Sequence, residues 1–309
     1  MATPTSRRAF LMGRRPPASP WDLFCARLVR TCSGNVRIAA SSKAQAGVDQ
    51  AWLEPVRHVD VAHARALCQE YGVTLALAGC ARSGGSQRAT LWVTPLAHGA
   101  TFSPVKEQAG CWRVDAGCTI AQVQETGIFE GLVLAPELTL AQWFAGVCAP
   151  QQRVSLEAAR IVERAEVLLA DGTLEVLGPF GSNAQTPLRS LALQRLVPKL
   201  FELAGSEEAQ LCAQASPWPA LFRLDALFAC ATQEPNLAQL LFGHQGRLGW
   251  VQTLWLRRLD TPPAQGHTGC VLPDLQLLAS QLDQELKHIL DPLGVFGVDA
   301  LAKGLESGS

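Results

Sequence analysis

The side chains best suited to acid–base or metal chemistry are the six histidines and ten cysteines of this 309-residue chain. Histidine titrates near neutral pH, and both residue types are common zinc ligands. No two cysteines have the C-x-x-C spacing, and the histidines have no spacing typical of a metal site or a catalytic triad. We therefore expect no metal, and we expect most cysteines to be small buried apolar residues.

Two stretches that contain glycine could instead allow a neighbouring group to approach the backbone closely. The first, residues 78–86, follows an apolar strand predicted over 73–77. The second contains Gly243, Gly246 and Gly249 and leads into another predicted strand. His244 lies within this second stretch and is a candidate acid or base, the alternative being a histidine that is only packed or solvated.

Apolar periodicity and turn residues predict alternating helices and strands that position these stretches. The firmest prediction is a hairpin turning at Asp171 and Gly172. Helix 191–203 should break at Pro198, and Asp274 should cap the last helix. The predicted helices are 55–71, ended by Gly72, then 120–124, 191–203, 236–242 and 275–290; the predicted strands are 73–77, 91–94, 112–116, 163–170, 173–177 and 248–259.

Composition limits the class of protein. A hydrophobic content of 48% supports a sizeable core, and a formal net charge of -1 gives no reason to expect nucleic acid as a partner. No apolar run is long enough for a transmembrane segment. The stretch from Ser6 to Leu11 resembles a twin-arginine export signal but lacks the apolar region that should follow. We expect a cytoplasmic protein, with export to the periplasm as the alternative.

The expected organisation is a basic, flexible leader over residues 1–45, a main domain over 46–262, and a short helical C-terminal remnant over 263–309. The main domain divides into two subdomains, about 46–160 and 161–262.

Four segments, read in order, resemble the FAD-linked oxidase family, which has the FAD-binding domain of vanillyl-alcohol oxidase and para-cresol methylhydroxylase and includes the FAD-binding subunit of glycolate oxidase. The resemblance implies an α+β fold with two subdomains around an FAD cleft. Only one helix fits between Pro263 and Asp291, so no full substrate cap domain is expected. The four segments are the strand-turn-helix 112–123, the hairpin start 165–172, the glycine run 240–252 and the C-terminal stretch 286–296.

The resemblance also implies where FAD would bind. Two loops would flank its pyrophosphate, with further contacts from Val167, Gly243 and Gly246. The first loop keeps one glycine where the family has three in a row, and the second has lost both of its glycines. Gln142 can either hydrogen-bond the pyrophosphate or fill its space. The first loop comprises Gly79, Cys80, Ala81, Arg82 and Ser83, and the second Thr139, Ala141 and Gln142.

The implied function is that of an FAD-binding subunit of an oxidoreductase that oxidises a 2-hydroxy acid such as glycolate or D-lactate. A related flavoprotein subunit and an iron–sulfur subunit are the implied partners. The resemblance transfers no catalytic base, which leaves His244 as the one candidate. The alternative is a structural or regulatory relative that keeps the fold without the flavin.

Overall fold

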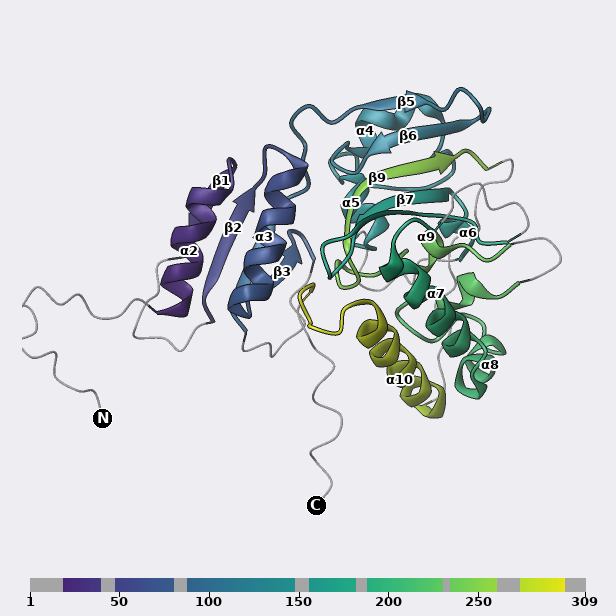
Figure 1. The fold of residues 1–309 in the computed structure, drawn as a ribbon. Coiled ribbons are helices and arrows are strands. Elements are labelled where there is room, and N and C mark those ends of the chain that lie inside the picture. Colours follow the sequence, from purple (N-terminus) through teal and green to yellow (C-terminus); the bar gives the residue numbers. More distant parts are fainter. Residues whose placement is uncertain are drawn as a thin grey trace, which may run out of the picture.

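The computed structural model describes residues 19–39, 48–80, 88–147, 156–181, 188–229, 234–259 and 273–297. Its strands form two sheets that lie side by side (Figure 1). The first has the order β1-β2-β4-β3, and the second has the order β5-β6-β9-β7-β8. Helices pack on both sheets, which confirms the predicted α+β class.

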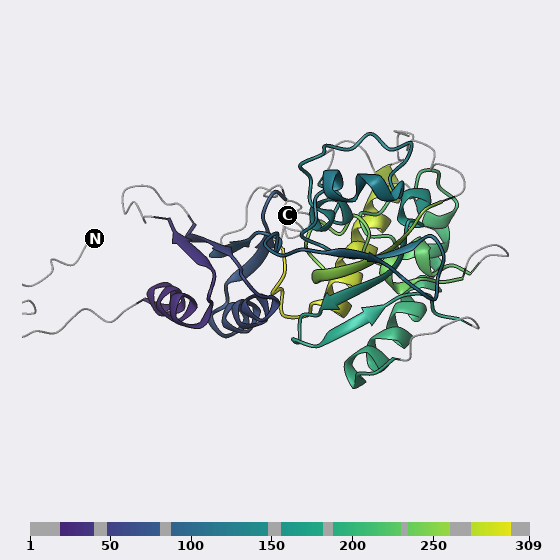
Figure 2. The same cartoon turned by 90° about the horizontal axis from the view of Figure 1, so that it is seen from above.

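The first sheet is mixed. β2 and β3 run parallel to β4, whereas β1 is antiparallel to β2. Helices α2 and α3 lie on the same side of the sheet (Figure 2). The elements of this unit are α2 (Pro20–Thr31), β1 (Asn35–Ile38), β2 (Gln50–Glu54), α3 (His58–Tyr71), β3 (Thr74–Leu77) and β4 (Thr90–Val93).

Residues 19–39 fold, although we expected them to belong to a flexible leader. Ser19 and Asp22 form a reciprocal capping box at the start of α2. Phe24 and Leu28 are completely buried on the side of α2 that packs against α3. The cap and this apolar face explain why the segment is ordered despite its basic composition.

The second sheet is antiparallel, and its central strand β9 comes last in the sequence. The hairpin predicted at Asp171 and Gly172 is confirmed, with Leu168 opposite Leu174 and Gly172 at a positive φ of 93°. The strands are β5 (Phe102–Pro104), β6 (Cys111–Asp115), β7 (Val162–Leu168), β8 (Leu174–Leu177) and β9 (Trp250–Arg257). Strands β5 and β6 therefore join the second sheet, so the sheets divide between residues 93 and 102 and not near residue 160.

The helices of this unit differ from the sequence expectations at Pro198 and Asp274, and helices α5, α6 and α8 were not predicted. Helix α7 continues through Pro198, where a break was predicted, because its buried face, which includes Val197 and Leu200, packs into the core. Asp274 lies in the first turn of α10 and not at its cap. The helices are α4 (Ile120–Val123), η1 (Gln124–Thr126), α5 (Leu140–Phe144), α6 (Leu156–Ala159), α7 (Leu191–Ala204), α8 (Glu207–Ala213), η2 (Leu224–Leu227), α9 (Leu237–Leu240) and α10 (Pro273–Leu290).

After α10 the chain returns to the first sheet. Phe296 forms a parallel bridge with Leu75 of β3. The N–H of Leu75 donates to the carbonyl oxygen of Val295 at 2.7 Å, and the N–H of Gly297 donates to the carbonyl oxygen of Leu75 at 2.8 Å. The end of the described chain therefore extends the sheet beyond β3.

This return is held by a buried ion pair, Lys287 and Asp291, which we call the C-terminal clasp. The Lys287 ammonium donates to the carbonyl oxygens of Arg247 and Phe296, both at 2.7 Å. Asp291 accepts the backbone N–H groups of Val295 and Phe296. All charged atoms of the clasp thus have partners, as buried charges require.

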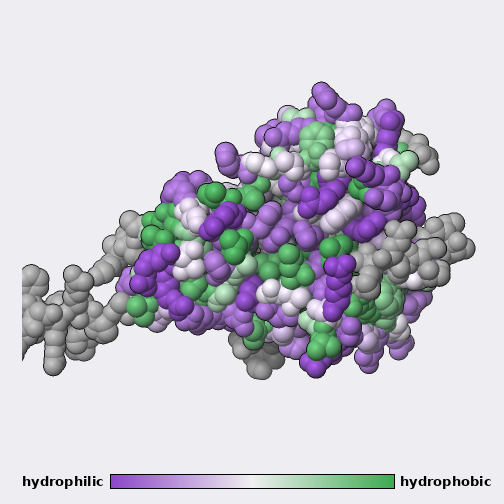
Figure 3. Space-filling model, turned by 45° about the horizontal axis from the view of Figure 1, so that its top comes forward, coloured by the Kyte–Doolittle hydropathy of each residue, from purple (hydrophilic) through white to green (hydrophobic). Residues whose placement is uncertain are grey.

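Three further findings concern the surface, the length and polarity of the helices, and the export-like sequence near the N-terminus. On the face drawn in Figure 3, hydrophilic residues are interspersed with small hydrophobic patches. No helix among the described residues is long and apolar enough to cross a membrane. Ser6 to Leu11, which carry the export-like sequence, lie outside the described residues.

Candidate functional site

Three segments that are far apart in sequence meet where the two sheets adjoin: Ala78–Cys80, Thr139–Gln142 and Gly243–Gly246. We call this place the junction. A Cβ atom on Gly246 would lie 2.9 Å from the Cβ of Leu77 and 3.8 Å from the Sγ of Cys80. The N–H of Gly243 donates to the carbonyl oxygen of Phe144, at the end of α5, at 2.8 Å. The junction thus brings together the segments expected to hold the cofactor.

The backbone N–H groups at the start of α5 already have protein acceptors. The N–H of Leu140 donates to the carbonyl oxygen of Cys118 at 2.8 Å, and that of Ala141 to the carbonyl oxygen of Ala116 at 2.7 Å. The Gln142 N–H donates to the Thr139 hydroxyl at 3.3 Å. A phosphate at this turn would have to displace these bonds, because each N–H group supplies one proton.

Gln142 connects the two loops that would flank a pyrophosphate. Its Oε1 accepts from the backbone N–H and the hydroxyl of Thr139, at 3.1 and 3.0 Å. Its Nε2 donates to the carbonyl oxygen of Ala78 at 3.0 Å. A Cβ on Gly79 would lie 2.6 Å from that Nε2. The glutamine side chain therefore fills the space directly over Gly79.

Gly79 itself retains the features of a phosphate-facing residue. Its φ of 94° is a conformation that glycine adopts without strain. Its N–H donates to no acceptor among the described residues. The neighbouring Cys80 is partly buried, and burial raises the pKa of its thiol to about 12, so the thiol stays protonated at neutral pH.

The glycine turn after α9 is shaped by the backbone. Gly243 and Gly246 have positive φ values of 81° and 69°, and Gln245 between them has a φ of 53°. Further along, a Cβ on Gly249 would lie 2.8 Å from the Cγ1 of Val167. Val167 is completely buried in β7. It supports the turn from within the core.

His244 is buried at the centre of this turn, with 2% of its surface exposed. Its Nδ1 accepts the backbone N–H of Leu248 at 3.4 Å, and its ring packs edge-on against Phe144. Burial, followed by the positive charge of Lys287, lowers the pKa of His244 to about 3. A side chain this buried and this weakly basic is poorly suited to remove a proton from a substrate at neutral pH.

The structure thus brings together seven of the residues expected to bind the cofactor. It places one more of them, Val167, and the separate catalytic candidate His244 in the core. Ala81, Arg82 and Ser83 lie outside the described residues. The seven are Gly79, Cys80, Thr139, Ala141, Gln142, Gly243 and Gly246.

Two supports of the junction were missed in the sequence. The C-terminal clasp holds the backbone of Arg247, next to the glycine turn. Arg65 of α3 donates to the carbonyl oxygen of Ala170, at the hairpin turn, and so ties the two units together. The i, i+4 spacing of Lys287 and Asp291 was a readable signal of a helical pair. No local pattern indicated the partner of Arg65.

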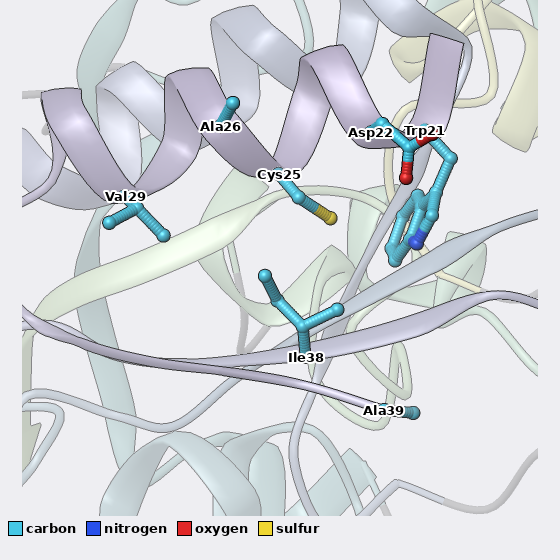
Figure 4. Close-up of a pocket in the computed structure, with 7 residues that line it drawn as sticks. All are labelled: Trp21, Asp22, Cys25, Ala26, Val29, Ile38 and Ala39. Carbon is cyan, nitrogen blue, oxygen red and sulfur yellow. The ribbon is translucent and has the colours of Figure 1, made fainter. Parts of the chain in front are cut away.

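A separate groove of about 520 Å³ lies between α2 and β1 (Figure 4). β1 is at the edge of the first sheet opposite β3. The groove is therefore not part of the junction. Its lining is mainly apolar and consists of Trp21, Asp22, Cys25, Ala26, Val29, Ile38 and Ala39.

No protein-family model matches the sequence. No curated protein matches it either. Among solved structures, the chain is similar to wild-type BBE-like 1 from Physcomitrella patens, with 11% identity and a TM-score of 0.42 over 75% of this chain and 44% of that one. It is also similar to 4-ethylphenol oxidase from Gulosibacter chungangensis in complex with isoeugenol, with 15% identity and a TM-score of 0.47 over 81% of this chain and 45% of that one.

An alkyldihydroxyacetonephosphate synthase is a third similar structure, with 12% identity and a TM-score of 0.39 over 68% of this chain and 32% of that one. The chain spans less than half the length of each of these three proteins. The similarity concerns the fold alone.

Proposed function

We propose that this chain is an FAD-binding subunit of an oxidoreductase and that the junction is where it would hold the pyrophosphate of FAD. The observation that carries the proposal is the convergence of the Gly79 loop, the start of α5 and the glycine turn, which are the segments that resemble the family's flavin-binding segments. Their meeting at one place is the minimum that a shared cofactor site requires.

The residues of the junction fit a pyrophosphate on one side only. Gly79 offers a backbone N–H with no acceptor among the described residues, in a conformation open to close approach. The α5 side does not fit in this arrangement, because its N–H groups are used and Gln142 covers Gly79. Binding would require the Gln142 side chain to turn away from Ala78. FAD, when bound, would supply a hydride acceptor.

The substrate class and the partners extend this proposal. The resemblance favours a 2-hydroxy acid such as glycolate or D-lactate. It also favours a related flavoprotein subunit and an iron–sulfur subunit as partners. His244 is buried, so the chain offers no evident base from the glycine turn, and a base supplied by a partner subunit is consistent with that arrangement.

A second candidate, a flavin-free structural or regulatory relative, is favoured by one specific observation. Gln142 joins the two loops by a direct hydrogen bond to Ala78, so the junction is closed without any ligand. A junction whose two loops are joined by the protein's own hydrogen bond can be stable with no cofactor bound.

Flavin binding separates the two candidates. The purified protein is examined for visible flavin absorption, then titrated with FAD while quenching of flavin fluorescence is followed. We expect about one FAD per chain, with binding lost in Gly79→Val, whose side chain would occupy the space through which the pyrophosphate must approach the backbone of Gly79. Gly99→Val is the matched control, because Gly99 also has a positive φ but has nothing within 4 Å of the place where its Cβ would lie.

A colourless protein that binds no added FAD would overturn the proposal and leave the flavin-free candidate. If FAD binds, anaerobic addition of glycolate or D-lactate should bleach the flavin absorption when the required partners are present. Bleaching by neither acid would refute the proposed substrate class.

A further inference from the structure

Two helices of this fold start with the same motif. Thr119 and Gln122 form a reciprocal capping box at α4, and Thr139 and Gln142 form one at α5. In each box the threonine hydroxyl accepts the glutamine N–H at 3.3 Å, and the glutamine Oε1 accepts the threonine N–H. The two glutamines thus have the same local role.

They differ in what the amide nitrogen does. Gln122 is exposed, whereas Gln142 is half-buried and its Nε2 donates to the carbonyl oxygen of Ala78. Capping uses only the Oε1 of a glutamine, so the bond to Ala78 is an additional one. It joins residues 64 positions apart in sequence.

The position of Gln142 decides what can approach Gly79. Its Nε2, Cδ and Cγ would lie 2.6, 3.5 and 3.8 Å from a Cβ on Gly79. A ligand atom approaching the backbone of Gly79 from this side would meet the same three atoms. Glycine at this place leaves room for a neighbour, and here that neighbour is the glutamine side chain.

We propose that Gln142 controls how readily the junction admits a dinucleotide diphosphate: its side chain over Gly79 competes with the ligand, and its removal opens the approach to Gly79. This inference deepens the proposed function and rests on it for the identity of the ligand as FAD. It assigns to Gln142 a selectivity role beyond capping α5.

The test compares FAD binding by the wild type, Gln142→Gly and Gln122→Gly, measured by quenching of flavin fluorescence. Gln122→Gly loses the corresponding capping bond from the threonine N–H to the glutamine Oε1 and introduces the same residue, so it controls for damage to the helix start. We expect Gln142→Gly to bind FAD at least about tenfold more tightly than the wild type, and Gln122→Gly to match the wild type. Inorganic pyrophosphate should compete with FAD in Gln142→Gly.

Alkylation of Cys80, followed by peptide mass spectrometry, gives a second readout that needs no flavin. Cys80 lies next to Gly79, so it should react faster in Gln142→Gly than in Gln122→Gly if the Ala78 bond keeps the loop closed. Gln142→Ala, which favours the helix more than glycine does, replaces Gln142→Gly if that variant fails to fold.

The outcomes separate this inference from the proposed function. Tight and equal binding by the wild type and Gln142→Gly would overturn the inference and leave the function standing. Binding by Gln142→Gly alone would support the inference and show that the wild-type chain is flavin-free. Absence of binding in all variants would overturn both.

Discussion

Acidification should weaken the folded state through His244. Its pKa in the folded chain is lowered from 6.5 to about 3, first by burial and then by the charge of Lys287. The unfolded chain has a histidine with an ordinary pKa, so between these two values it binds a proton that the folded chain does not. This contribution to the free energy of unfolding is fully present above about pH 6.5 and is lost progressively towards pH 3.

The size of the effect follows from the distance to the unfolded pKa. At about pH 5, which is about 1.5 units below that value, the loss is about 2 kcal/mol, at about 1.4 kcal/mol per unit. We would measure urea unfolding of the wild type and of His244→Asn at about pH 7.5 and about pH 5. Asparagine cannot take up the proton, and its Oδ1 can still accept the N–H of Leu248.

The difference in unfolding free energy between the two proteins should change by about 2 kcal/mol between the two pH values. Other titrating groups cancel in this double difference. His63→Asn is the control, because His63 is exposed on α3 and its substitution should give a change below about 0.5 kcal/mol. If the difference in unfolding free energy between the wild type and His244→Asn changes with pH as little as it does for His63→Asn, the reasoning is refuted. The folded protein would then bind a proton at His244 as readily as the unfolded chain does.

Two further predictions concern the C-terminal return. Asp291→Asn removes the charge that pairs with the buried ammonium of the clasp, so it should lower the free energy of unfolding by about 3–5 kcal/mol. Asp274→Asn is the control, because it lies on the exposed first turn of α10 and should lower the free energy of unfolding by less than about 1 kcal/mol. Equal effects of the two variants in urea unfolding would contradict this prediction. Gly297→Ala should cost about 2 kcal/mol or more, because its φ is 72° and the new Cβ would lie 2.6 Å from a side-chain carbon of Arg247. Gly110→Ala is the control: its φ is 74° and the space around it is open, so the substitution should lower the free energy of unfolding by about 1 kcal/mol. If thermal unfolding shows Gly110→Ala to be less stable than Gly297→Ala, the steric argument is refuted.

Elements with a local chemical cause could be predicted from the sequence. The hairpin at Asp171 and Gly172 follows from turn chemistry, and helix α3 ends at Gly72 because that residue adopts the left-handed conformation of a helix cap. The same kind of signal, the Ser19 and Asp22 capping box, was present at the start of α2. The prediction of a flexible leader rested on its basic composition alone, although arginines on the exposed side of a helix do not oppose its folding.

Features that depend on partners distant in sequence could not be predicted. Nothing near Gln142 in the sequence indicates that its amide would reach Ala78, so the sequence alone is compatible with either of two roles for that residue. That β5 and β6 belong to the second sheet could not be predicted for the same reason, because β6 pairs with β9, a strand that begins only at Trp250. The resemblance located the junction by its glycines, but only the hydrogen bonds show that it is closed.

The parallel bridge between Leu75 and Phe296 has a consequence for how the protein is made. As the chain leaves the ribosome, the strands of the first sheet emerge before those of the second, whereas the segment that extends the first sheet beyond β3 emerges only after the whole second sheet. Until then, β3 would present an unpaired strand edge that can associate with other nascent chains. The first unit can reach its final form only after translation has passed Phe296, so a chain released before that point would carry an open edge.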